Sequence, residues 1–269
     1  HEKFDILSFI AVAFAFITLI MGFSNLNQVV DHLVFVLCCF IIGISSLYYF
    51  TKRQLHIKNP LIHLDIFNHK SFTFHTLAIM FLQMTTLGYG LLLPTFVQIV
   101  LKQPATDAGV ILLPGAIVGA LFAPVGGLIL DRFGAKKPII LGICCSFIST
   151  ICFLFLFDKL TYQLCMILYF IYSLGIGLIV GNTMTCAMSH LPTNLQADGN
   201  ATLQTLMQLS GGIGTSITAA ILAFVQQGTN LYDGTNRGTL FVLVFLIFNV
   251  TIVVLSQYFA FKGGEKNEF

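Results

Sequence analysis

Charge is scarce in this chain, and it is missing from the middle of every long apolar stretch. Charged residues make up 9% of the 269 residues, whereas soluble domains carry about 25%. All eleven Asp and Glu residues lie at the ends of apolar stretches or between them. This excludes a water-soluble domain, and it removes the acidic side chains that a proton pump uses inside a membrane.

Tryptophan is absent, so an interfacial aromatic belt must rely on tyrosines such as Tyr48 and Tyr49. The seven cysteines all lie in apolar runs without a C-x-x-C pair, which favours small hydrophobic side chains over a disulfide framework. A net charge of +2 is too small to indicate a nucleic-acid partner. No nucleophile–base or metal-ligand spacing faces a predicted cavity, so we predict no enzyme, no cofactor and no metal.

Eight apolar stretches are present, each long enough to cross a bilayer, which takes about 20 residues. They exceed strand length and lack period-two alternation. We therefore predict an all-α polytopic membrane protein with eight transmembrane helices, separated by breaks at 25–31, 103–107, 158–159 and 191–194 and by a Gly/Asn-rich loop at 228–238. The predicted spans are 5–24, 32–50, 73–100, 107–130, 137–157, 160–188, 200–226 and 238–261.

Positively charged residues are concentrated on one side of these spans, where ten of the thirteen Lys and Arg residues lie. Those ten are Lys3, Lys52, Arg53, Lys58, Lys70, Arg132, Lys136, Lys137, Lys262 and Lys266, against Lys102, Lys159 and Arg237 on the other side. Since cytoplasmic loops carry the excess of Lys and Arg, we predict that both ends of this segment are cytoplasmic. An even number of spans agrees with that orientation.

The connection at 51–72 is the longest on the predicted cytoplasmic side. After Pro60, apolar residues alternate with His63, Asp65 and His69, which is typical of a short helix lying on the membrane surface. The same three polar side chains are of metal-ligating types, but a wet polar face explains them without a metal. This connection separates two leading spans from a block of six.

Small residues recur every fourth position in three spans. Gly115, Gly119, Ala123 and Gly127 form a ridge on one face of the fourth span, which lets a neighbouring backbone approach. Similar ridges occur at Ser173, Gly177 and Gly181, and at Gly211, Thr215 and Ala219. Ordinary tight packing explains such ridges, and so does an interface that slides during transport.

The most specific motif joins the fourth and fifth spans. It comprises Gly127, Asp131, Arg132, Gly134, Lys136 and Lys137. The string matches G-x-x-x-D-R-x-G-x-K-K, the loop signature of the major facilitator superfamily, and the chain resembles that family. The resemblance implies that these residues control conformational switching.

Three further stretches, at 92–98, 108–115 and 198–214, resemble the fourteen-span drug:proton antiporters of the superfamily. In that group two extra helices link two six-helix bundles. The resemblance therefore implies linking helices at 1–58, a cytoplasmic interfacial segment at 59–72 and a C-terminal six-helix bundle at 73–269. The first bundle would be missing here, and we expect a longer protein. Met207 stands where an Arg is expected, so Asp131 should interact with Arg132 or with the start of the seventh span near 198–200.

The resemblance also implies that the third and sixth spans line a substrate cavity. The candidate substrate residues are Met80, Gln83, Met84, Leu87, Tyr169, Tyr172, Ile176 and Gln208. Flexible and aromatic side chains suit hydrophobic or cationic drugs. Interhelical hydrogen bonds and plain packing are the alternative explanations for the same residues.

We thus predict the C-terminal part of a proton-coupled multidrug efflux antiporter in the bacterial inner membrane, working by alternating access. Its partners would be drugs, protons, the lipid bilayer and the missing N-terminal bundle, with the proton-binding carboxylate in that bundle. Two alternatives stay open: a facilitator for another small solute such as a sugar or an organic anion, and a non-transporting membrane subunit or sensor. Intramembrane acids in the missing part would favour the antiporter.

Overall fold

A computed structural model describes residues 5–26, 32–57, 60 and 62–264 of the chain, and every regular element in them is helical. Eight helical stretches are long and apolar enough to span a membrane, which confirms the predicted fold class. Lys3, Lys58 and Lys266 of the charge count lie outside the described residues. The elements are α1 (Ile6–Ser24), α2 (Leu33–His56), η2 (Leu64–Asn68), α3 (Lys70–Ile99), α4 (Ala105–Val110), α5 (Leu113–Phe133), α6 (Lys136–Phe155), η3 (Phe157–Lys159), α7 (Tyr162–Ser189), η4 (Thr193–Leu195), α8 (Gln196–Gln226) and α9 (Leu231–Gly264).

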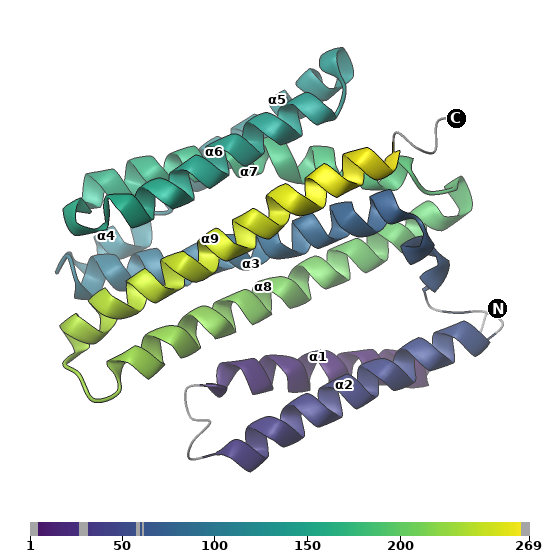
Figure 1. The fold of residues 1–269 in the computed structure, drawn as a ribbon, viewed down its shortest axis with the longest axis horizontal. Coiled ribbons are helices and arrows are strands. Elements are labelled where there is room, and N and C mark those ends of the chain that lie inside the picture. The colour runs from purple at the N-terminus through teal and green to yellow at the C-terminus, as the bar shows by residue number, and fades with distance from the viewer. Residues whose placement is uncertain (1–4, 27–31, 58–59, 61, 265–269) are drawn as a thin grey trace.

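The long helix α3 lies at the centre of the bundle. It packs against α9, α8 and α7, while α5 and α6 pack against α7 (Figure 1). Helices α1 and α2 form an antiparallel hairpin that contacts α8, where the hydroxyls of Ser24 and Ser216 are 2.9 Å apart. The two leading helices therefore lie against one outer helix of the block of six.

The hairpin is closed at one end by an ion pair. The Arg53 guanidinium donates to both oxygens of Asp5, with Nε–Oδ2 at 2.9 Å and Nη2–Oδ1 at 3.1 Å. The Ser8 hydroxyl also donates to this carboxylate. Because these donors favour the charged form, they hold the pKa of Asp5 well below its usual range. Asp5 is therefore ionised at every pH at which an ordinary carboxyl group is ionised. The ion pair with Arg53 accordingly persists across the physiological pH range.

The predicted span 107–130 contains a break that its apolar sequence does not reveal. Helix α4 ends at Val110, residues 111–112 form a turn, and α5 starts at Leu113. Pro114 falls in the first turn of α5. Proline is tolerated there because the first N–H groups of a helix have no intrahelical acceptor.

The predicted loop at 228–238 is wrong over most of its length, because α9 already begins at Leu231. The Asn230 side chain accepts a hydrogen bond from the Asp233 N–H at 2.8 Å and so stabilises the start of the helix. Gly234 lies within α9 and allows close packing of this helix against α8. A Cβ at this position would lie 2.7 Å from the Cα of Gln226 on α8.

The connection before α3 contains the five-residue 3₁₀ helix η2, in which Ile66 is fully buried. His63, just before η2, contacts the start of α8. Its N–H donates to Asp198 Oδ2 at 3.0 Å, and its Nδ1 is 2.6 Å from the same oxygen. His63 of the predicted polar face thus attaches this connection to α8 through Asp198.

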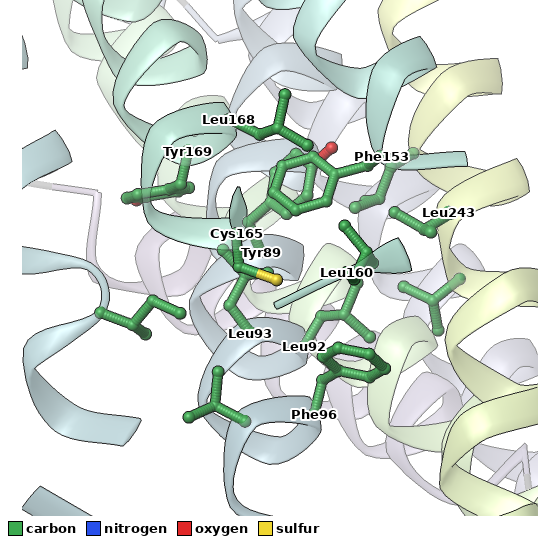
Figure 2. Packing of buried hydrophobic residues seen from close by; sticks show 14 of the residues in the cluster. Tyr89, Leu92, Leu93, Phe96, Phe153, Leu160, Cys165, Leu168, Tyr169 and Leu243 are labelled. Carbon is green, nitrogen blue, oxygen red and sulfur yellow. The ribbon is translucent and has the colours of Figure 1, made fainter. Parts of the chain in front are cut away.

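The largest apolar cluster joins α3, α6, α7 and α9. Tyr89 is fully buried within it, with its ring centroid 5.2 Å from that of Phe153 and 4.9 Å from that of Tyr172. Figure 2 shows Tyr89 and Phe153 side by side, with Cys165, Leu168 and Tyr169 of α7 around them. Since α3 supplies Tyr89, Leu92, Leu93 and Phe96 to this cluster, its rotation relative to α7 is fixed by packing.

Candidate functional site

The glycine ridge of α5 packs against α7. A Cβ at Gly115 would lie 2.5 Å from the Tyr169 ring, and a Cβ at Gly177 would lie 2.5 Å from the carbonyl oxygen of Gly119. At the second contact the backbones of α5 and α7 touch directly, and only glycine leaves room for this. The predicted close approach of a neighbouring helix is confirmed for Gly115, Gly119 and Gly177.

The ridge does not extend to Gly127, where an added Cβ would meet nothing within 4 Å. Gly126 faces α7 instead, and its added Cβ would lie 2.7 Å from Asn182 Nδ2. At 3.6 residues per turn, eleven residues after Gly115 return to within about 20° of the same face, whereas twelve residues overshoot by about 120°. Residues spaced by four therefore rotate gradually away from the helix face that contacts α7. Gly181 of α7 likewise has open space around it.

Three of the candidate substrate residues on α3 lie where α3 crosses α8. A Cβ at Gly214 would lie 2.5 Å from the carbonyl oxygen of Met84. At Gly211 it would lie 2.5 Å from Leu87 Cδ1 and 3.3 Å from Gln83 Cγ. Met80 is half-buried on α3, Leu87 is exposed, and Gln208 is exposed on α8.

The candidate residues on α7 lie on another side of α3. Tyr172 is fully buried, and its hydroxyl is 2.9 Å from Thr86 Oγ1. Tyr169 is 7% exposed and Ile176 is half-buried. Tyr89, which contacts both tyrosines, lies about 200° around α3 from Leu87. In this conformation the α3 and α7 candidates therefore do not form one continuous wall.

Sequence reasoning missed Tyr89, which stands at the centre of the aromatic cluster. Its neighbours Gly88 and Gly90 were the available signal, because small residues beside an aromatic ring let other helices approach it. A Cβ at Gly88 would lie 2.8 Å from Leu246 of α9. Tyr89 and its glycine neighbour thus bring α9 and α7 close to α3.

The signature motif forms a tight turn between α5 and α6. Gly134 ends α5 with φ +80°, and its N–H donates to the Leu130 carbonyl at 2.8 Å. This left-handed conformation favours glycine. The Lys137 ammonium stands 4.7 Å from the centroid of the Phe133 ring and braces the same turn.

Asp131 in the last turn of α5 is exposed. Within the described part of the chain its carboxylate makes no ion pair, so the expected pairing with Arg132 is not formed. Asp198, near the start of α8, is engaged by His63 instead. The Asp131 carboxylate thus stands at the C-terminal end of a helix, where the macrodipole disfavours it, and is open to a contact from outside these residues.

Two surface grooves lie away from the candidate substrate residues. One of about 650 Å³ runs between α8 and α9 and is lined by apolar side chains such as Phe224, Phe241 and Phe248. Another of about 480 Å³ lies between α6 and α9, with Lys136 and Lys262 in its lining. The candidate substrate residues line neither groove, whereas Lys136 of the signature motif lines the second.

A glycine-packed bundle of membrane-spanning helices with this turn motif defines a multi-pass protein of transporter type. The chain belongs to the Major Facilitator Superfamily, whose family profile matches residues 6–215.

Two relatives are named for drug resistance. The chain is 31% identical to the lincomycin resistance protein LmrB of Listeria monocytogenes over 240 residues, which cover 88% of this chain and 50% of LmrB. It is 27% identical to the quinolone resistance protein NorB of Staphylococcus aureus over 236 residues, covering 87% of this chain and 50% of NorB. The chain thus spans about half the length of these relatives.

A solved structure shares the fold. It is the crystal structure of a bacterial homologue of the human lysosomal transporter Spinster, in an inward-facing and occupied conformation. The TM-score is 0.57 at 14% sequence identity, over 86% of this chain and 57% of the other. At that identity the likeness describes the fold alone.

Proposed function

We propose that this chain forms two linking helices and one six-helix bundle of a proton-coupled multidrug efflux antiporter that works by alternating access. Its similarity to LmrB and NorB over more than four fifths of its length carries this proposal. A transporter also fits better than an enzyme, because the chain belongs to the Major Facilitator Superfamily and resembles proteins named for drug resistance. The protein would lie in the bacterial inner membrane with both ends of this segment in the cytoplasm.

The drug would contact the face of α3 that meets α8. Met80, Gln83, Met84 and Leu87 recur at spacings of three and four on that face, and Gln208 is exposed on α8. Methionine and leucine side chains adapt to varied apolar shapes, and an amide can satisfy one polar group of a ligand. Tyr169, Tyr172 and Ile176 would reach the drug only in a conformation in which α3 and α7 separate.

Proton coupling would reside in a further bundle. The described acidic residues all lie near helix ends or in connections, so none can bind a proton at the middle of the membrane. The greater length of LmrB and NorB leaves room for such a bundle. The two bundles would then rock around a site between them.

Cysteine labelling tests the substrate face. On a cysteine-free full-length background, Gln83→Cys, Met84→Cys and Gln208→Cys should react with a water-soluble maleimide, and a bound lipophilic cation should slow each reaction. Leu82→Cys is the matched control, because Leu82 is 1% exposed on the same helix and should stay unreactive. Tyr172→Cys should react only during turnover. The proposed face is excluded if positions 83, 84 and 208 stay unreactive while position 82 is labelled.

The signature motif would control switching between conformations and leave drug recognition alone. Asp131→Asn removes the one carboxylate of the motif while keeping its shape, so we expect drug efflux to fall at least about tenfold, which corresponds to about 1.4 kcal/mol on the barrier. Equilibrium drug binding should be nearly unchanged. Asp158→Asn is the control, because Asp158 is also exposed but lies in η3, outside the motif. A large loss of binding with normal efflux kinetics would refute this role.

A facilitator for another small solute is the second candidate function, and the lack of a mid-membrane carboxylate in the described residues favours it. The two functions differ in their energy source. A facilitator equilibrates its solute without a pH gradient, whereas an antiporter accumulates it only when a gradient is imposed.

A further inference from the structure

Three metal-ligating side chains, one of them far from the other two in the sequence, lie together between α3 and α7. They are His75 of α3, Cys186 in the last turn of α7, and His190 directly after α7. The ligand atoms of all three lie within 4.8 Å of one another. Because Cys186 and His190 are four residues apart, they lie on the same face of the helix.

The buried side chain of His75 lacks hydrogen-bond partners. Its side chain is fully buried, and neither ring nitrogen has a hydrogen-bond partner. The Phe261 ring covers it in an edge contact, with the centroids 5.5 Å apart. A buried imidazole without any partner loses its hydration without compensation, so a group bound at one of these nitrogens would remove part of the penalty.

His190 is already oriented as a ligand. Its Nδ1 lies 2.7 Å from the Cys186 carbonyl oxygen, and since a carbonyl can only accept, Nδ1 carries the proton. Nε2 is then left with a free lone pair. A second hydrogen bond that fixes the tautomer in this way is the usual companion of a metal-bound histidine. His190 is half-buried at the end of α7, so an ion could reach the cluster from that end.

Gln257 of α9 completes the surroundings. It lies beside His75, is 1% exposed and donates through Nε2 to Thr183 Oγ1 at 3.1 Å, while its Oε1 has no partner. A closer approach of the Gln257 amide would give one nitrogen of His75 a hydrogen-bond partner. The other nitrogen would still lack a partner, so the amide alone does not satisfy the site.

We propose that His75, Cys186 and His190 bind a zinc ion that links α3 to α7. Two imidazoles and one thiolate are a donor set that zinc accepts in tetrahedral coordination. On binding, the Cys186 thiol releases its proton to solvent as the zinc–sulfur bond forms. A water molecule fills the fourth position, and Oε1 of Gln257 accepts a hydrogen bond from it.

The geometry requires only a local adjustment. With bonds of about 2.0–2.3 Å, tetrahedral zinc holds its ligand atoms about 3.5 Å apart. The present limit of 4.8 Å therefore has to contract by about 1 Å when the ion binds. The expected consequence is a closer attachment of α3 to the end of α7.

Metal titration of the full-length protein, purified free of zinc, tests this proposal. Cobalt(II) serves as the spectroscopic probe, because a thiolate ligand gives it a charge-transfer band in the near ultraviolet. We expect one equivalent to bind with this band, and zinc to displace it. Cys186→Ser should abolish the band and weaken zinc binding more than about 100-fold, since loss of even a second-shell partner costs 10- to 100-fold. Cys165→Ser, a buried cysteine of the same helix, should change neither.

A stability measurement keeps the test decisive if Cys186→Ser folds poorly. His75→Phe keeps a ring against Phe261 and removes both unpartnered nitrogens, so the metal-free variant should melt no lower than the original protein. Added zinc should raise the melting temperature of the original protein but not of His75→Phe. The proposal is overturned if the original protein binds no stoichiometric metal, or if the charge-transfer band or the zinc-dependent stabilisation survives in the respective variant.

Discussion

Gly177→Ala is expected to unfold the bundle at a lower temperature, whereas Gly181→Ala, one turn further along the same helix, should not. The new methyl group at position 177 would lie 2.5 Å from the Gly119 carbonyl oxygen and 3.2 Å from the Gly119 Cα. Both are backbone atoms, so relief requires α5 and α7 to move apart. Overpacking of this kind costs about 1–3 kcal/mol, and a larger side chain such as valine should prevent folding.

Gly181→Ala is the matched control, because an added Cβ there meets nothing within 4 Å. Both variants gain the same helix propensity, up to about 1 kcal/mol for Ala over Gly, so their difference isolates the helix contact. Thermal unfolding in detergent, followed by light scattering or by thiol exposure, measures that difference. Equal melting temperatures for the two variants would show that α5 and α7 do not meet as described.

The spans could be predicted because each depends on local sequence. Apolar runs bounded by Pro, Gly and charged residues predict the ends of most of the eight spans to within a few residues of the observed helix ends. The predicted start of α9 is too late because the pattern places Gly234 in a loop, whereas Gly234 packs closely against Gln226. A glycine in the sequence does not reveal which of these two uses applies, since both require the missing Cβ.

Contacts between helices could be predicted only in part. The ridge of α5 was recognised, yet its last contact is Gly126 and not Gly127, because a four-residue spacing drifts around a 3.6-residue helix. The substrate faces assigned to α3 and α7 stay a prediction. Their relative rotation is set by the packing of Tyr89 and its neighbours, and no local pattern encodes it.

The cluster of His75, Cys186 and His190 could not be predicted from spacing. His75 lies far from the other two residues in the sequence, with α4, α5, α6 and most of α7 in between. Cys186 looked like any other cysteine in an apolar run. Only the packing of α3 against α7 brings the three side chains together.

The central claim is that residues 1–269 form one part of a two-bundle drug antiporter and need a further bundle to transport. LmrB and NorB are each about twice as long as the part that this chain matches. The described residues also hold no carboxylate in the middle of a span. Without a second bundle, the described helices would have no partner to rock against and no carboxylate in the middle of the membrane to carry the proton.

Reconstitution in liposomes tests this claim most directly. Residues 1–269 alone, and the full-length protein that we propose to contain them, are placed in separate liposomes with an imposed pH gradient, and movement of a fluorescent lipophilic cation is recorded. Collapse of the gradient with an ionophore is the control for coupling. We expect gradient-dependent movement with the full-length protein and none with residues 1–269. Gradient-dependent movement by residues 1–269 alone, or none by the full-length protein, would contradict the account.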